Sequence, residues 1–412
     1  MGNTSARTAM AVRQDGDRRR WAVLAVGMLA MTAGCTFQFG LAYLMPALRD
    51  EGLSLSTAGV LAAAPTAGLL LTLVAWGAAA DRWGERWVLA GGLVAAGAVL
   101  TVATQMDGAV ALGFCFLLAG AAGASVHASS GRLILGWFTA HERGLAMGLR
   151  QTAQPLGVAI AAIALPALAA TGRIPALVFM SVFCLAAAVL VAAVVRDPQR
   201  TPAGSDERAG SPYRTSMLWR LHGASALLIV PQFTVATFAL VFLIDERGWD
   251  PSQAGHMLAA AQIGGAAARL LSGWWSDRVG SRMRPMRTVS VAIAVVVAIL
   301  AAGAAGGSAI AVGAVVAASI VSVSPNGLAF TAVAEHAGRA WAGRALGIQN
   351  TAQNAVAAAT PPIMAMVIGA DGYATAFAAA AVFPLLAVAV IPVRVEKRRH
   401  SAPAAADTAQ AR

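Results

Sequence analysis

Four arginines stand inside long apolar stretches of the sequence, and one of them, Arg220, lies close to the start of its stretch. The binding candidates among them are Arg132, Arg150 and Arg269. All 19 Asp and Glu residues fall outside those stretches. A guanidinium presents a fixed fork of donors that matches a carboxylate, and a charge inside an apolar span is costly enough to mark a functional site. We therefore expect these arginines to bind an anionic small molecule, with snorkelling of the Arg132 side chain to a membrane interface as an open alternative.

Polar amides occur in two stretches that read almost alike. One is "RQTAQ", which begins with Arg150, and the other is "QNTAQ", which begins at position 349. Residues four apart share one face of a helix. Each stretch therefore predicts a polar helix face, which either contributes to substrate binding or holds neighbouring helices together. The further binding candidates are Gln154, Gln353, Asn354, Asn350, Asn326 and Tyr43.

Titratable and metal-binding groups are few. His127 and His256 are candidates for proton coupling because imidazole ordinarily titrates near neutral pH, although packing is the commoner role of a lone histidine. The three cysteines have no ligand-like spacing, and no HExxH motif or buried pair of acids is present. We expect no metal, no cofactor and no enzymatic activity.

The elements that must carry these side chains are membrane-spanning helices. The chain is 58% hydrophobic and only 12% charged, with a mean hydropathy of +0.68. Apolar stretches of about 20 residues are long enough to cross a bilayer. Twelve such spans are predicted, at 21–48, 55–79, 87–105, 109–138, 144–169, 174–195, 217–243, 252–275, 288–305, 308–334, 342–369 and 373–395.

The distribution of charge predicts the topology. With the N-terminus inside, cytoplasmic segments carry 23 of the 30 basic residues and outer loops carry three, as the positive-inside rule requires. The net charge of +11 is therefore topological, and we expect no nucleic-acid partner. The predicted domains are a cytoplasmic arm at 1–20, six-helix bundles at 21–195 and 217–395, a cytoplasmic linker at 196–216 and a cytoplasmic tail at 396–412.

An internal duplication is visible at two places. The "TAQ" stretches lie 199 residues apart, and "GAAADRWGER" from Gly77 recurs as "GWWSDRVGSR" from Gly273 at an offset of 196. Parallel repeats of six helices are a known transporter architecture. The fold class is accordingly all-α and polytopic, with two pseudo-symmetric bundles.

The repeated loop, G-x-x-x-D-R-x-G-x-R, resembles the signature of the major facilitator superfamily, and the resemblance covers essentially the whole chain. It implies a cytoplasmic gate in which the loop of each half latches against the other half. We expect Gly77 and Gly273 to allow close helix approach, and Gly84 and Gly280 to form tight turns. The remaining gate residues are Asp81, Arg82, Arg86, Asp277, Arg278 and Arg282.

The resemblance implies a secondary transporter of the inner (cytoplasmic) membrane that works by alternating access as a monomer. Arg269, four residues before Gly273, is placed like the arginine of the monocarboxylate and oxalate/formate branches. A small organic anion is thus the expected substrate, with a co-transported proton or a counter-anion. A proton-driven exporter of hydrophobic drugs and a non-transporting membrane sensor remain as alternatives.

Overall fold

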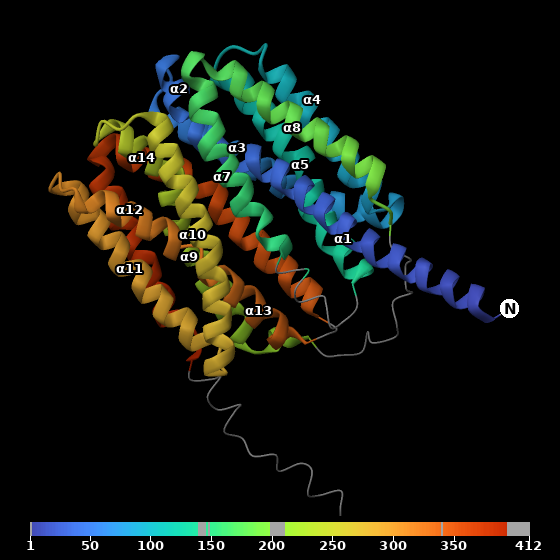
Figure 1. Cartoon of the computed structure of the whole chain (residues 1–412). Coiled ribbons are helices and arrows are strands. Elements are labelled where there is room, and N and C mark those ends of the chain that lie inside the picture. Colours follow the sequence, from blue (N-terminus) through green and yellow to red (C-terminus); the bar gives the residue numbers. More distant parts are fainter. Residues whose placement is uncertain (1, 139–145, 147–148, 198–210, 339–340, 394–412) are drawn as a thin grey trace, which may run out of the picture. The chain divides into compact units, whose positions relative to one another are not determined.

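The computed structural model describes residues 2–138, 146, 149–197, 211–338 and 341–393. Throughout these ranges the regular secondary structure is helical, without a strand. The chain divides into two units, residues 1–202 with 248–262, and residues 203–247 with 263–412. Each unit is described by itself, with the helix labels of Figure 1.

Unit 1 is built around α1 and α5. Within it α1 packs against α5, α7 and α8, and α5 also packs against α3 and α4. Residues 2–20 of the segment predicted as an N-terminal arm are helical and form the first half of α1. The elements are α1 (Gly2–Gly40), η1 (Leu41–Leu44), α2 (Met45–Asp50), α3 (Leu55–Trp83), α4 (Glu85–Ala103), α5 (Ala109–Trp137), α7 (Ala153–Leu168), η2 (Ala169–Thr171) and α8 (Arg173–Val194).

Unit 2 is built around α9, which packs along α14 and also contacts α11, α12 and α13. Its elements are η3 (Pro212–Arg214), α9 (Ser216–Asp245), α11 (Met283–Ala305), α12 (Ile310–Val321), α13 (Pro325–Ala337) and α14 (Ala342–Val390). The helix α10 (Pro251–Val279) belongs to both units. Its first turns join unit 1, where a Cβ at Gly255 would lie 2.1 Å from the carbonyl oxygen of Ala162.

The long α14 is a hairpin of two helices, because Gly372 inside it has φ 81° and ψ 174°. Contacts with α9 give the direction of each arm. Gln349 in the first arm bonds Ser225 near the start of α9, whereas Tyr373 bonds Asp245 at its end. The carbonyl of Val390 then accepts from Arg220, again near the start of α9. The first arm therefore runs parallel to α9 and the second runs antiparallel.

Each predicted span corresponds to helix in the described chain. Within the described ranges, ten helices are long and apolar enough to cross a membrane. One of them is the α14 hairpin, which holds two predicted spans, and α10 coincides with the remaining one, 252–275. Two predicted spans are interrupted, 21–48 by the 3-10 turn η1 and 308–334 between α12 and α13. In both cases the next helix has Pro in its first turn, where the missing N–H costs nothing.

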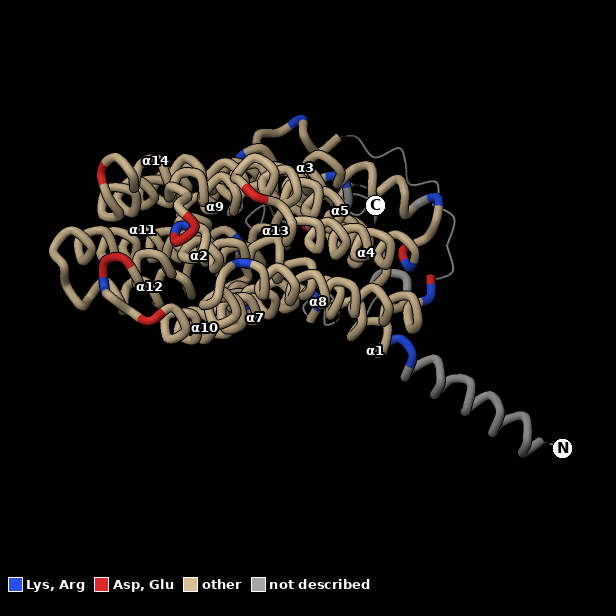
Figure 2. Tube along the Cα trace, turned by 90° about the horizontal axis from the view of Figure 1, so that it is seen from above, with Lys and Arg blue, Asp and Glu red and all other residues tan. Residues whose placement is uncertain are grey.

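Charge lies at the ends of these helices. Most described acidic residues occupy loops and helix ends, as with Asp50 at the end of α2 and Glu85 at the start of α4. The exceptions are Asp15 and Asp17 in the polar first half of α1 and Asp371 beside the kink of α14. Figure 2 shows the helix middles almost entirely without Asp or Glu. Among the described residues, the buried charged side chain inside a predicted span is that of Arg150.

Glycine brings the helices of unit 1 into close contact. A Cβ at Gly120 of α5 would lie 2.0 Å from the carbonyl oxygen of Pro65 in α3, and one at Gly92 of α4 would lie 1.9 Å from Ser125 Oγ. Lipid supplies no hydrophobic force between helices, so association depends on such close packing. At Gly77 and Gly273 a Cβ would meet no heavy atom within 4 Å among the described residues, so the close helix approach expected at these two positions stays a prediction.

Gly91 and Gly92 allow a matched test of this packing. We expect Gly92→Ala to lower the thermal unfolding temperature in detergent, since overpacking costs about 1–3 kcal/mol. Gly91→Ala, one residue away with nothing within 4 Å of its Cβ, should be neutral or slightly stabilising. Equal unfolding temperatures for the two variants would contradict the packing described here.

Candidate functional site

Arg150 is buried in unit 1, with 8% of its surface exposed. Its Nε donates to Ser130 Oγ of α5 at 3.0 Å, and Nη2 points to Met31 Sδ of α1 at 3.6 Å. Both partners are neutral, and no acidic partner of this guanidinium occurs in the described ranges. The arrangement holds a positive charge inside the unit with donors left for an anion.

His127 lies one turn before Ser130 on α5 and contacts α1. Its Nε2 is 2.8 Å from Gln38 Oε1. An amide oxygen only accepts, so Nε2 carries the hydrogen and donates. The amide nitrogen of Gln38 is buried without a hydrogen-bond partner in the described chain. Arg150, His127 and Gln38 thus belong to one polar strip between α1 and α5.

For the other predicted binding residues of unit 1, the structure gives the position in the helices but no hydrogen bond to the polar strip among the described side chains. Tyr43 lies in η1 with 3% exposure, and Gln154 is half-buried in α7. Arg132 belongs to α5, but its side chain lies outside what the structure describes.

In unit 2 the predicted amides make pairs. Asn326 of α13 donates to Gln232 of α9 at 3.1 Å. Asn354 donates to the Asn350 carbonyl oxygen at 2.9 Å and to its Oδ1 at 3.2 Å. Gln353 is buried, and its amide nitrogen has no partner in the described part of the unit.

Arg269 of α10 is half-buried, and its Nε donates to the Val323 carbonyl at the break between α12 and α13. His256, at the opposite end of α10 from the repeated loop, is exposed and its Nδ1 bonds the Ser252 carbonyl of its own helix at 2.7 Å. Local bonding of this kind favours a structural role for His256.

The structure also brings together a cluster of polar side chains in unit 2 that the sequence analysis did not predict. His222 and Gln349 are buried at 5% and 0% exposure and lie 2.6 Å apart, from His222 Nδ1 to Gln349 Oε1. Tyr213 and Ser225 extend the chain of bonds on either side. The sequence feature that could have pointed to this cluster is Gln349, which occupies the position equivalent to Arg150 in the duplication.

The first copy of the repeated loop joins α3 to α4. Gly84 has φ 87° and ψ 160°, a conformation that a side chain strongly disfavours. Asp197, just after α8, accepts from the backbone N–H of Arg86 at 2.8 Å, while the Arg86 guanidinium bonds the Ala192 carbonyl. An unpredicted carboxylate thus occupies the positive N-terminal end of α4.

Arginine and tryptophan lie together along both copies of the loop. Arg82 is exposed and its guanidinium carbon lies 5.7 Å from the centre of the Trp83 ring. Arg278 lies 4.0 Å from the centre of the Trp274 ring. The Asp81 side chain is outside the described structure.

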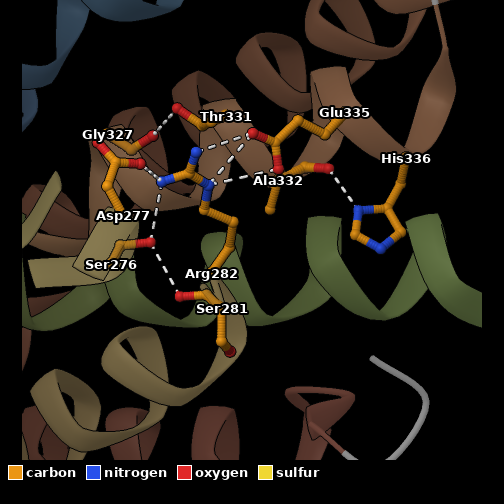
Figure 3. A network of polar contacts seen from close by, with 9 residues as sticks. All are labelled: Ser276, Asp277, Ser281, Arg282, Gly327, Thr331, Ala332, Glu335 and His336. Carbon is orange, nitrogen blue, oxygen red and sulfur yellow. Dashed lines mark hydrogen bonds and ion pairs between the residues drawn. The ribbon is translucent and has the colours of Figure 1, made fainter. Parts of the chain in front are cut away.

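The second copy joins α10 to α11 and is organised by Arg282 (Figure 3). Its guanidinium bonds Asp277, Ser276 Oγ at 3.0 Å, and Glu335 of α13 at 2.9 Å. Burial lowers the pKa of Arg282, but its bonds to Glu335 and Asp277 outweigh this and raise the pKa above the usual value. Gly280 supplies the turn, with φ 62°. The contacts named here for each loop lie among described residues of one unit.

Comparison with known proteins identifies the architecture. The profile of the Major Facilitator Superfamily matches residues 26–361. The chain belongs to this superfamily. It is also 44% identical over 380 residues to an uncharacterized MFS-type transporter of Mycobacterium tuberculosis, covering 91% of this chain and 85% of the relative.

Solved structures share the fold. A bacterial homologue of the human lysosomal transporter Spinster, in an inward-facing unoccupied conformation, has a TM-score of 0.77 at 16% identity, covering 90% of this chain and 96% of that one. A D-xylose-proton symporter has a TM-score of 0.72 at 16% identity, covering 91% and 98%. A point mutant of the nucleoside transporter NupG has a TM-score of 0.71 at 12% identity, covering 90% and 98%.

Membership of the Major Facilitator Superfamily makes the protein a multi-pass membrane transporter of the secondary type and not an enzyme.

The loop glycines of this superfamily member give a second test. We expect Gly84→Ala to lower the unfolding temperature more than Gly280→Ala. Both positions have positive φ, but only at Gly84 would a Cβ meet a side chain, Asp197 Oδ2 at 2.1 Å. Displacing that carboxylate costs about 1 kcal/mol, as for a lost helix cap.

The Asp197→Ala background provides the control. There the difference between Gly84→Ala and Gly280→Ala should shrink by about 1 kcal/mol, because only the Asp197 contact is removed and the backbone conformations of the two glycines are unchanged. An undiminished difference would show that the Asp197 contact is not its cause.

Proposed function

We propose that the protein transports a small organic anion, most readily a carboxylate, and that Arg150 binds the anionic group. The observation that supports this is the burial of the Arg150 guanidinium among neutral partners, Ser130 and Met31. An unpaired buried charge is unfavourable. A substrate carboxylate supplies the missing counter-charge.

Hydrogen bonds from the Arg150 guanidinium can supply enough binding free energy to distinguish an anion from a neutral solute. Hydrogen bonds to a charged group contribute about 1.5–3 kcal/mol each, and the guanidinium fork matches two carboxylate oxygens at once. A neutral sugar gains no comparable charge compensation. Discrimination between an anion and a neutral solute of similar size then follows from Arg150 alone.

Arg269 is the second arginine of the proposal. Its Nε is used by the Val323 carbonyl, which fixes the plane of the guanidinium at the break between α12 and α13. A hydrogen-bonded arginine is preorganised, so less side-chain entropy is lost when an anion binds. We assign Arg269 a supporting role in recognition.

The rival, an exporter of hydrophobic cations, would need acidic residues along its path. In the described part of the chain, Asp and Glu lie in loops, near helix ends, at the kink of α14 and in the polar first half of α1, and therefore outside the predicted spans. The sugar and nucleoside transporters share the fold at 16% and 12% identity, which carries no information about substrate. The anion proposal is therefore favoured by the residues of this chain.

Two further features belong to the proposal. The excess of Lys and Arg in the linker, tails and repeated loops places both termini on the cytoplasmic side of the cell membrane. The protein works as a monomer, with alternating access of its two halves about the substrate.

Arg150 provides the test. Purified protein in detergent is screened by thermal shift against carboxylates, phosphates, sugars and cationic drugs, and positive compounds are measured for uptake into proteoliposomes. We expect carboxylates to stabilise the wild type and Arg150→Ala to abolish that stabilisation. Arg150→Lys should retain part of it, because it keeps the charge but loses the fork.

Arg220→Ala is the matched control. Arg220 is also an arginine of a predicted span, but its Nε is bonded to the Val390 carbonyl at 2.9 Å within unit 2. Anion stabilisation should survive this substitution. If cationic drugs stabilise the protein and carboxylates do not, or if Arg150→Ala binds carboxylates normally, the proposed function fails.

A further inference from the structure

Four side chains of unit 2 form one continuous chain of hydrogen bonds at the start of α9. Tyr213 Oη lies 2.9 Å from His222 Nε2, and His222 Nδ1 lies 2.6 Å from Gln349 Oε1. Gln349 Nε2 donates to Ser225 Oγ at 2.7 Å. Three of the four residues, His222, Gln349 and Ser225, are buried.

The direction of each bond follows from the donors available. Gln349 Oε1 can only accept, so His222 Nδ1 carries a hydrogen and donates to it. In the neutral imidazole, Nε2 is then an acceptor and the Tyr213 hydroxyl donates to it. The chain therefore runs from Tyr213 through His222 and Gln349 to Ser225.

Protonation of His222 needs no rearrangement of this chain. When Nε2 gains a hydrogen it becomes a donor, and the Tyr213 oxygen can accept because a phenol both donates and accepts. The bond from Nδ1 to Gln349 is unchanged, and it is stronger when the donor is charged. Both states of the imidazole are thus hydrogen-bonded at both nitrogens.

Tyr213 connects this buried histidine to the linker. It lies in η3, near the end of the segment 196–216 predicted as linker, and is half-buried. Its ring stacks on His222 at 5.8 Å between centroids and packs edge-on against Trp219 at 5.1 Å and Trp341 at 6.3 Å. Burial raises the pKa of the Tyr213 hydroxyl, which keeps the phenol neutral and available as a donor.

The charged groups on neighbouring elements are engaged elsewhere or exposed. Arg220 of α9 bonds the Val390 carbonyl and Arg344 of α14 lies over the Trp341 ring at 5.0 Å. At the end of α13, Glu335 is paired with Arg282, and His336 Nδ1 bonds the Ala332 carbonyl at 2.8 Å. The remaining basic residues at this end of η3 and α11 are exposed, namely Arg214, Arg284 and Arg287.

We propose that His222 is a proton-binding site of unit 2 and that the Tyr213 hydroxyl delivers the proton from the linker side. In the transfer, the Tyr213 O–H bond breaks as the Nε2–H bond forms. The phenol oxygen takes a replacement proton from a hydronium ion of the solvent, which becomes water, so tyrosine ends neutral and the imidazole carries the charge. Gln349 orients the ring by holding Nδ1–H.

The duplication gives this proton a consequence for transport. Gln349, bonded to His222, is the repeat counterpart of Arg150. Protonation therefore gives unit 2 a buried positive charge where unit 1 has one permanently. Resting on the proposed function, we infer that anion binding is favoured in unit 2 only when His222 is protonated, which couples the proton to the anion in co-transport.

The proton site is tested without any substrate. The full chain is labelled with ¹³C and ¹⁵N at its six histidines, and imidazole signals are followed from about pH 5 to 9 in detergent, the range in which histidine titrates. We expect one titrating signal to vanish in His222→Gln, and that signal to show the Nδ1–H tautomer at high pH. Tyr213→Phe, which keeps the ring packing but removes the hydroxyl, should change the His222 Nε2 signal at high pH, because the hydrogen bond from Tyr213 is lost.

His336→Gln is the matched control, because His336 belongs to the same unit but bonds its own helix. It should remove a different signal and leave that of His222 unchanged. A His222 signal that does not titrate, that has the Nε2–H tautomer at high pH, or that ignores Tyr213→Phe overturns the proposal.

The coupling is tested separately by carboxylate uptake into proteoliposomes at about pH 6 and pH 8, on either side of the usual histidine pKa. Wild-type uptake should be several-fold faster at the lower pH, and His222→Gln should lose this ratio, with uptake at either pH no faster than that of the wild type at about pH 8. An unchanged ratio in His222→Gln overturns the coupling. If wild-type protein takes up no anion but His222 titrates as described, the proposed function fails and the proton site stands.

Discussion

A hydrocarbon layer offers no hydrogen bonds, so a chain that crosses it must satisfy every backbone N–H and C=O internally. The rest of this structure depends on that constraint. It explains why the described chain is helical, why charge gathers at helix ends, and why Pro occurs at the start of α2 and α13, where its missing N–H is harmless. It also makes the buried polar groups conspicuous, because each must find its partner within the protein.

The two units meet this demand differently at equivalent positions. In unit 1 a permanent charge, Arg150, is held by neutral partners on α1 and α5. In unit 2 an amide, Gln349, is held by a histidine and a serine on α9. The duplicated fold is retained, while the chemistry placed on it has diverged from fixed charge to titratable charge. In our proposal, substrate selectivity depends on Arg150 in unit 1, and energy coupling depends on His222 beside Gln349 in unit 2.

The repeated loops show the same divergence. Their sequences match closely, yet Arg86 bonds a helix-end carbonyl beside Asp197, whereas Arg282 bonds two carboxylates, Asp277 and Glu335. The two loops are thus stabilised by different partners, each among the described residues of one unit.

The sequence by itself determined the helices, their approximate ends, the duplication and the superfamily, because these depend on apolar length and local spacing. It also singled out Arg150, since a charge in an apolar stretch needs no structure to be noticed. Only the tertiary structure decided the partners. Nothing in the spacing links His222 to Gln349, 127 residues away, or Asp197 to the start of α4, and no pattern distinguishes the tightly packed Gly92 from its free neighbour Gly91. Such contacts are set by how helices pack across long sequence separations, which local periodicity does not encode.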